Sequence, residues 1–337
     1  MNKKHLWGIL IVLAISAYVI YSEIKATSFA VLLKAADSLV WSKVVLVFIL
    51  MLGSYACEAM ILHLLAKRPA SPKHSIWAWC RIPIIQSLFN AITPLASGGQ
   101  ASQLAAMVQM GIEGGRATSV LMMKFIIYQL AVFVAYIWAF ASGYHLVVTK
   151  FSGIAVLILL GFVMHVSSII FLLAVMFAHD WTVKFVKWLM SLLAKFINPQ
   201  KVAEWEKATM EKIATFYTES QKLKQDKGRL VKAAGLTVLQ LLCYYSIPFM
   251  TIQALGIHAS WLTVTETTLM IIMFMAVIPI PGASGGAEFS FQSLFSMFIA
   301  DSGQLVLGMF IWRFVTYFFG MLLGIFGWII RPKKVAD

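Results

Sequence analysis

The sequence has little charge for its length. Asp, Glu, Lys and Arg make up 12% of the 337 residues and hydrophobic residues make up 61%, whereas a soluble domain carries about 25% charged residues. The longest polar stretch, residues 179–232, is too short and too highly charged to form an independent enzyme core. This composition excludes a soluble enzyme and predicts an integral membrane protein.

Metal-ligating and nucleophilic residues are also sparse. The three cysteines, Cys57, Cys80 and Cys243, lie far apart in apolar stretches, which excludes a disulfide framework and a cysteine-based metal motif. The seven histidines show no spacing typical of metal ligands. The sequence contains no nucleophile elbow, no Gly-Lys-Ser phosphate loop and no Rossmann glycine pattern. We therefore expect no metal, no cofactor and no catalytic residue.

Strict alternation of apolar and polar residues, which is typical of membrane strands, is missing as well. The apolar stretches are instead continuous and long enough to cross a bilayer as helices. We therefore predict an all-α, polytopic membrane protein with a single transmembrane domain over residues 1–337. The predicted spans are residues 6–21, 43–66, 118–144, 154–177, 233–255 and 305–330. We interpret residues 6–21 as a span rather than a signal peptide because no small-residue cleavage site follows them.

What the chain does contain is a six-residue pattern, Pro-x-Ala-Ser-Gly-Gly, which occurs at residues 94–99 and again at residues 281–286. Pro and paired Gly interrupt helices, and a broken helix inside a bilayer is tolerated only within protein or beside a water-filled cavity. We therefore predict two broken, re-entrant hairpins, at residues 75–110 and 262–300. The predicted arms are residues 76–92 and 101–110 in the first hairpin and residues 262–280 and 289–299 in the second. Matched breaks in two halves of a chain indicate a binding site where the halves meet. The alternative is a pair of packing kinks, because Gly and Pro are common in membrane helices.

The distribution of Lys and Arg predicts the orientation. With a cytoplasmic N-terminus, twenty of the 27 fall in cytoplasmic segments, four fall outside and three lie within apolar stretches, as the positive-inside rule requires. Both termini are then cytoplasmic, and the two hairpins enter from opposite sides as inverted repeats. We interpret the basic cytoplasmic segment 179–232 as helices on the membrane surface, or alternatively as covers over the ends of the spans. The same rule accounts for the net charge of +13, so we expect no nucleic acid partner.

A few polar groups lie where an ionisable side chain costs roughly 2.5–3.5 kcal/mol to insert. Glu58, Lys124 and Arg313 fall within predicted spans, and Glu288 directly follows the second Ser-Gly-Gly. Free N–H groups at the breaks, together with the buried cations, predict an anion site that a lipid phosphate would fit. Alternatively, Glu58–Lys124 and Glu288–Arg313 are ion pairs that hold the bundle together. The candidate lipid-binding residues are Glu58, Asn90, Ser97, Gly98, Gly99, Gln100, Lys124, Ser284, Gly285, Gly286, Glu288, Arg313 and Tyr317.

At these residues the sequence resembles a known family. Residues 90–100, residues 278–288 and the Arg313-Phe-x-x-Tyr317 stretch are similar to the flippase-like membrane domain of lysylphosphatidylglycerol synthases, the multiple peptide resistance factors. The resemblance covers nearly the whole chain and implies movement of aminoacylated phosphatidylglycerol between leaflets, a property linked to antibiotic resistance. In that family a separate cytoplasmic domain transfers the lysyl group from lysyl-tRNA. Because the sequence ends at Asp337, soon after the last span, we expect no such transfer from this chain by itself.

The sequence thus predicts a flippase or translocase that handles a phospholipid headgroup such as (lysyl-)phosphatidylglycerol in the bacterial cell (plasma) membrane. The expected partners are membrane phospholipids, anionic or aminoacylated, and the sequence leaves a homo-oligomer open. Three alternatives remain: a lysyltransferase that modifies phosphatidylglycerol, a small-solute transporter, and an envelope regulator that transports nothing.

Overall fold

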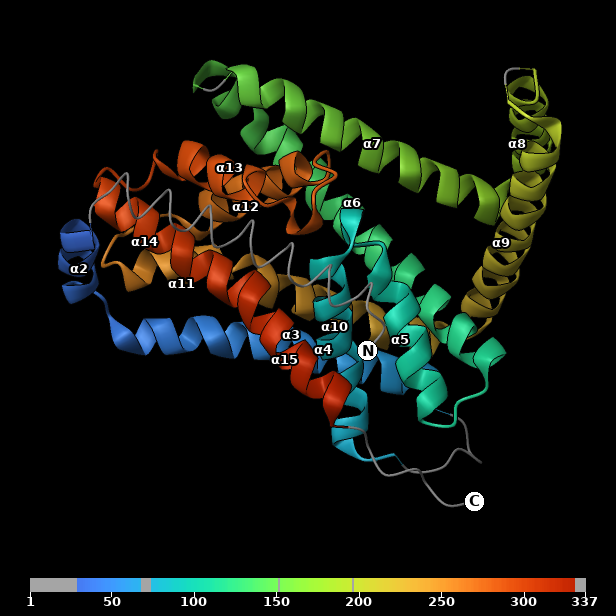
Figure 1. The fold of residues 1–337 in the computed structure, drawn as a ribbon, viewed down its shortest axis with the longest axis horizontal. Coiled ribbons are helices and arrows are strands. Elements are labelled where there is room, and N and C mark those ends of the chain that lie inside the picture. The colour runs from blue at the N-terminus through green and yellow to red at the C-terminus, as the bar shows by residue number, and fades with distance from the viewer. Residues whose placement is uncertain (1–28, 68–73, 151, 196, 331–337) are drawn as a thin grey trace.

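The structure is a computed structural model that describes residues 29–67, 74–150, 152–195 and 197–330 (Figure 1). Within these ranges the chain forms helices and no strand, which confirms the all-α prediction. The elements are α2 (Phe29–Asp37), α3 (Trp41–Ala66), α4 (Ile76–Ile92), the 3-10 turn η1 (Pro94–Ala96), α5 (Gly98–Gln109), α6 (Gly114–Lys150), α7 (Ser152–Phe177), α8 (His179–Leu193), α9 (Pro199–Gln225), α10 (Lys227–Tyr245), α11 (Ile247–Ala254), α12 (Trp261–Met275), the 3-10 turn η2 (Pro281–Ala283), α13 (Gly286–Phe295), α14 (Ser302–Arg313), the π-helical stretch η3 (Phe314–Phe319) and α15 (Gly320–Ile329). The predicted first span, residues 6–21, and both termini lie outside the described residues.

Five stretches among the described residues are long and apolar enough to cross a membrane, and they coincide with the other predicted spans. They are Trp41–Ala66, Gly114–His145, Gly153–Phe177, Lys227–Ala254 and Ser302–Ile329. One of them combines α10 and α11, and another combines α14, η3 and α15. Figure 1 shows α3 and α7 running from left to right and α6 running back. The chain is therefore a multi-pass membrane protein.

The first repeated pattern separates α4 from α5. Leu95 and Ala96 adopt left-handed backbone conformations, with φ of 52° and 53°, so the chain reverses there instead of continuing as a helix. We predicted that the return arm begins at residue 101, but α5 begins at Gly98. The reason is a cap: the Gly98 N–H donates to Thr93 Oγ1 at 2.9 Å, which satisfies a helix N-terminus.

The second repeated pattern separates α12 from α13. We predicted that the first arm continues to residue 280, but α12 ends at Met275, because the prolines that follow cannot donate to the helix ladder. Gly282 then turns the chain with φ of 62°. The return arm begins at Gly286 rather than at residue 289, since the Glu288 carboxylate accepts from the Gly285 N–H at 2.7 Å and caps the first turn.

The rod formed by α14, η3 and α15 shows how the two hairpins are placed. Near its start, Gln304 donates to the carbonyl of Leu255, just before the second hairpin, at 3.3 Å. At its end, the carbonyl of Gly327 accepts from Arg81, near the start of the first hairpin. The hairpins therefore begin at opposite ends of the rod. Their tips, η1 and η2, pack against each other.

Each hairpin lies in its own apolar core. One core contains Ile82 of α4 and Met107 of α5, packed with the second half of α3 and the first half of α6. The other contains Leu269 of α12 and Phe291 of α13, packed with α11 and α14. The spanning helices α3 and α6 pass through both cores.

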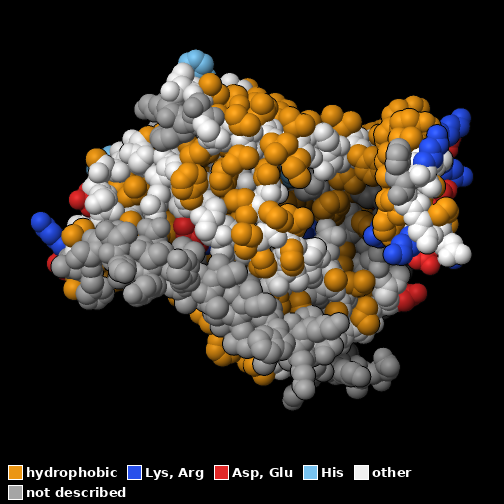
Figure 2. Space-filling model, turned by 45° about the horizontal axis from the view of Figure 1, so that its top comes forward, with side chains coloured by type: hydrophobic (Ala, Val, Ile, Leu, Met, Phe, Trp, Pro, Cys, Tyr) orange, Lys and Arg blue, Asp and Glu red, His pale blue; other side chains and the backbone are white. Residues whose placement is uncertain are grey.

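α8 and α9 form a hairpin across one end of the bundle, at the right of Figure 1. Exposed aromatic side chains follow one face of α8 at helical spacing: Trp181, Phe185 and Trp188. Lys184 and Lys187 are also exposed; Lys184 borders this face and Lys187 lies farther round the helix. In Figure 2 hydrophobic side chains gather at the top of this hairpin, and Lys and Arg lie along its outer edge and at its lower end. This arrangement is typical of a helix that lies along a membrane surface.

Candidate functional site

The two breaks pack against each other, and one side chain of the last span joins them. η1 packs against η2, and α4 also contacts η2. Tyr317, in the π-helical stretch of the last span, donates its hydroxyl to the carbonyl of Ala91 at 3.0 Å. Its ring lies so close to Gly282 that a β-carbon there would overlap it. A hydrogen bond to α4 and a ring contact with η2 therefore fix the two breaks relative to each other.

The second break is held by a buried ion pair. Arg313 is 4% exposed and Glu288 is 6% exposed, and the Arg313 Nε donates to Glu288 Oε1 at 2.7 Å. The Arg313 Nη2 also donates to the Gly282 carbonyl at 2.6 Å and to Ser284 Oγ at 3.4 Å. The guanidinium stacks over the Tyr317 ring at 4.3 Å from its centroid. The predicted pair is therefore present, and it is bonded directly to the backbone of the break.

The glycines of the two patterns are required for different reasons. A β-carbon on Gly98 would lie 2.7 Å from Thr93 Cγ2, and one on Gly99 would overlap the Asn90 amide. These two allow α5 to approach α4 closely. Gly285 instead has open space around it but a φ of 87°, which only glycine adopts without strain. Close approach thus explains the first Gly-Gly pair, whereas backbone conformation explains Gly285.

The first half carries a second buried ion pair, surrounded by carboxamides. Lys124 of α6, 9% exposed, is paired with Glu58 of α3, 7% exposed. The Lys124 Nζ also donates to Gln103 Oε1 at 3.0 Å and to Gln86 Oε1 at 3.4 Å. The Glu58 carboxylate accepts from Gln103 Nε2 at 2.8 Å and from Gln240 Nε2 at 3.1 Å. Four helices and the return arm α5 therefore meet in one polar network.

This network opens onto a cavity of about 250 Å³. Its walls are formed by one acid, one base, several carboxamides and a few aromatic or apolar side chains: Glu58, Gln86, Asn90, Gln100, Gln103, Leu121, Lys124, Phe125, Tyr128, Gln129 and Gln240. Ionisable side chains are costly to keep inside an apolar bundle, so the cavity around Lys124 and Glu58 is the candidate functional site.

The predicted site residues divide into two groups. Glu58, Asn90, Gln100 and Lys124 line the cavity. The second group, Ser284, Glu288, Arg313 and Tyr317, surrounds the second break. Gly98, Gly99 and Gly286 contribute backbone to the breaks, whereas Ser97 and Gly285 are exposed. The structure therefore does not gather the predicted residues into a single anion site.

Two cavity residues, Gln86 and Gln240, were missed by the sequence reasoning, which singled out ionisable groups within the apolar stretches and polar residues close to the breaks. A carboxamide in such a stretch is a weaker but similar signal, because its polar atoms need partners there. Arg81 is a third buried cation, and it donates to Gln109 Oε1 at 2.9 Å and to the carbonyl of Gly327. It holds the base of the first hairpin to the end of the last span.

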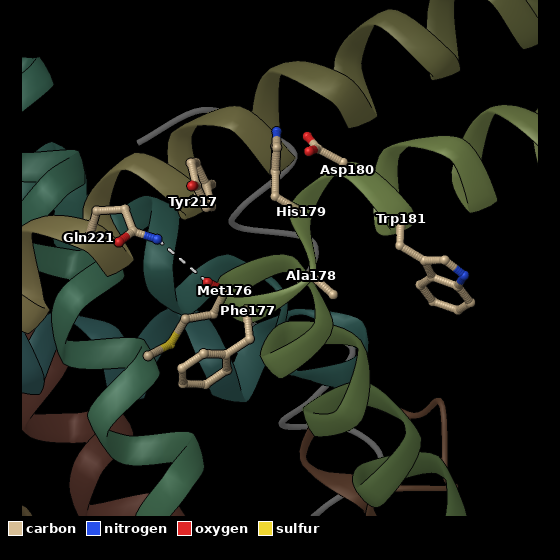
Figure 3. Close-up of a pocket in the computed structure, with 8 residues that line it drawn as sticks. All are labelled: Met176, Phe177, Ala178, His179, Asp180, Trp181, Tyr217 and Gln221. Atoms are coloured by element: carbon tan, nitrogen blue, oxygen red, sulfur yellow. Dashed lines mark hydrogen bonds between the residues drawn. The ribbon is translucent and has the colours of Figure 1, made fainter.

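A second cavity, of about 290 Å³, lies where α7 turns into α8 beside α9 (Figure 3). Its walls include His179 and Asp180 at the start of α8, and Tyr217 and Gln221 of α9. The rings of His179 and Tyr217 stack at 4.3 Å, and Gln221 Nε2 donates to the Met176 carbonyl at 3.5 Å. These contacts fasten the surface hairpin to the end of a span, so we assign this cavity a structural role.

The fold and its buried polar sites define a multi-pass membrane protein built around two broken helical hairpins. The chain matches the family described as lysylphosphatidylglycerol synthase TM region over residues 6–324, and it belongs to that family. A relative from Archaeoglobus fulgidus, described as UPF0104 membrane protein, is 25% identical over 331 residues, which is 94% of each chain. The resemblance inferred from the two breaks is thereby confirmed.

Proposed function

We propose that this protein is a membrane lipid translocase that carries a phospholipid headgroup through the cavity beside the first break. The observation that carries the proposal is the cavity itself, in which Lys124 and Glu58 face several carboxamides inside an apolar bundle. Broken helices from two halves of a membrane protein commonly surround a substrate site near the midplane. The family match supports this proposal, because the family is named for a synthase of an aminoacylated phospholipid.

The size of the cavity favours a headgroup over a whole lipid. Its volume of about 250 Å³ lies just below the range for small-molecule sites, which begins at about 300 Å³. Acyl chains would therefore stay in the surrounding bilayer while the polar headgroup occupies the cavity. Lys124 is the cation that a phosphate would contact there, since it lines the cavity and Arg313 is bonded to the second break.

The proposed arrangement places the chain with the α8–α9 hairpin on the cytoplasmic membrane surface. Most Lys and Arg residues of segment 179–232 then face the cytoplasm, as the positive-inside rule requires, and the aromatic face of α8 enters the headgroup region. In this orientation the first hairpin enters from the cytoplasm and the second from outside, so that the two form inverted repeats.

A leaflet assay tests the proposed function. The purified protein is placed in liposomes with fluorescent phosphatidylglycerol, and lipid in the outer leaflet is measured by dithionite quenching. We expect Lys124→Gln to slow translocation about 10- to 100-fold, because a hydrogen bond to a charged group contributes about 1.5–3 kcal/mol and 1.4 kcal/mol corresponds to a factor of ten.

The matched control is Lys43→Gln. Lys43 also bonds a glutamine, donating to Gln253 Oε1 at 3.0 Å, but it lies at the start of α3, away from the cavity. This variant should translocate lipid at the wild-type rate. If the wild-type protein moves no lipid faster than empty liposomes, or if Lys124→Gln matches the wild type, the proposed function is wrong.

A further inference from the structure

The cavity wall carries one positive and one negative side chain, and this balance restricts the ligands that it can take. Lys124 and Glu58 neutralise each other in the structure. Removing one partner of a buried ion pair leaves an uncompensated charge, which is strongly destabilising. A purely anionic headgroup that takes Lys124 leaves Glu58 without its cation, and a purely cationic one leaves Lys124 without its anion. A ligand with both charges leaves neither side chain unpaired.

The ion pair is built so that it can open. Lys124 has two further acceptors, Gln103 Oε1 and Gln86 Oε1. Glu58 has two further donors, the amide groups of Gln103 and Gln240. Each ion is therefore held by neutral side chains that do not belong to the pair. The two charged groups can separate around a ligand while both keep hydrogen-bond partners.

One atom in the wall points to the kind of group that lies beside Glu58. Gln240 is 7% exposed, and its Oε1 is buried with no hydrogen-bond partner within the part of the chain that the structure describes. Its Nε2 donates to Glu58 Oε2 at 3.1 Å, so the amide cannot be flipped without placing two oxygens against each other. Glu58 and Gln240 both line the cavity, and the amide that bonds the carboxylate also carries the unpartnered carbonyl oxygen. Both accept hydrogen bonds, so their natural ligand is an N–H donor.

We propose that the cavity selects a zwitterionic headgroup, with its phosphate on Lys124 and its ammonium on Glu58 and Gln240. This inference rests on the proposed function and specifies its substrate class. An ammonium that carries hydrogen satisfies both the charge of Glu58 and the free acceptor of Gln240. Phosphatidylethanolamine and phosphatidylglycerol esterified with an amino acid both present a phosphate and such an ammonium, so either lipid can be the source.

Binding is measured directly, apart from transport, by native mass spectrometry of the purified protein in detergent. The probes are phosphatidylethanolamine, alanyl-phosphatidylglycerol, phosphatidylglycerol and phosphatidylcholine. We expect the first two to bind about tenfold more tightly than the last two, as one charge-assisted hydrogen bond would produce. Phosphatidylcholine is the sharp comparison, because it has the same charges as phosphatidylethanolamine but no N–H. The ratio between the first two probes identifies the source of the ammonium.

Two variants locate the selectivity. Glu58→Gln and Gln240→Leu should each remove the preference for phosphatidylethanolamine over phosphatidylglycerol. The control is Gln253→Leu, in α11, which should keep the preference because Gln253 does not line the cavity. Equal binding of phosphatidylethanolamine and phosphatidylcholine by the wild type, or an unchanged preference in Glu58→Gln, overturns the inference. If lipid is translocated without such a preference, the proposed function stands and the zwitterion inference fails. If the preference is present but no lipid is translocated, the zwitterion inference stands and the proposed function fails.

Discussion

Loss of the ion pair at the second break, between Arg313 and Glu288, should strongly lower the free energy of unfolding of the protein. Arg313→Met removes the 2.7 Å bond to Glu288 and the 2.6 Å bond to the Gly282 carbonyl. It also leaves the carboxylate of Glu288, a residue that is only 6% exposed, with the Gly285 N–H as its hydrogen-bond donor among the residues that the structure describes. Breaking a buried pair from one side costs about 3–5 kcal/mol. We expect the free energy of unfolding, measured by reversible titration with SDS in mixed micelles, to fall by this amount.

The double variant Arg313→Met/Glu288→Met distinguishes a true pair from two separate contributions. Replacing both charges by apolar side chains of similar size is often neutral, although loss of the Glu288 cap costs about 1 kcal/mol. The double variant should therefore be more stable than Arg313→Met by at least about 2 kcal/mol. Lys43→Met, at a partly exposed cation, should change stability by no more than about 0.5 kcal/mol. The reasoning is refuted if the double variant shows the sum of the two single losses, or if Arg313→Met is as stable as the wild type.

Two further predictions concern the breaks and the orientation. Gly98→Ala should lower stability by about 1–3 kcal/mol, because the new methyl group overlaps Thr93 and disturbs the cap; Gly114→Ala, where nothing lies within 4 Å of the new atom, is the matched control in the same SDS titration. Equal stability of the two variants would contradict close packing at the first break. Single cysteines are placed at Gly114 and Ser302 in a background without Cys57, Cys80 and Cys243. They should react with a membrane-impermeant reagent from opposite sides of the membrane. A spin label at position 188 should contact lipid. Reaction of both cysteines from the same side would exclude the inverted arrangement.

The sequence was sufficient for the positions of the helices because bilayer-length apolar runs have few alternative structures. The first arm of the first hairpin, α4, has the bounds that the sequence predicts, Ile76–Ile92. The return arms were predicted to begin three residues late, because their starts depend on caps by Thr93 and Glu288 that form only when the break closes. Propensity alone places glycines outside a helix, and a local cap reverses that preference.

The ion pairs could be predicted because few counter-ions exist in an apolar sequence. Glu58 and Glu288 are acids within the predicted membrane region, so the candidate partners of Lys124 and Arg313 were few. The cavity could not be predicted in the same way. The carboxamides that line it belong to helices that are far apart in the chain. Gln86 of α4 and Gln240 of α10 are more than one hundred residues from each other. Only the tertiary packing shows that they face one space.

The π-helical stretch after Arg313 was not predicted either. A π turn inserts one extra residue into a helix and is often found at functional sites. Here the π turns at Phe314–Phe319 include Tyr317, whose hydroxyl reaches the Ala91 carbonyl while its ring lies under Arg313. No composition signal marks this stretch, because its residues are ordinary membrane-helix residues.

The two ion pairs differ in what surrounds them, and this difference separates their roles. Around Arg313 and Glu288 the closest partners outside the pair are backbone groups, the Gly282 carbonyl and the Gly285 N–H, whose positions are fixed by the break itself. Around Lys124 and Glu58 the partners are carboxamide side chains, which can rotate and can both donate and accept. A pair bonded to backbone holds a shape, whereas a pair bonded to rotatable amides can exchange its partners for a ligand. In the proposed function, the first half would therefore provide the adaptable site, and the second half would provide the fixed support against which its tip packs.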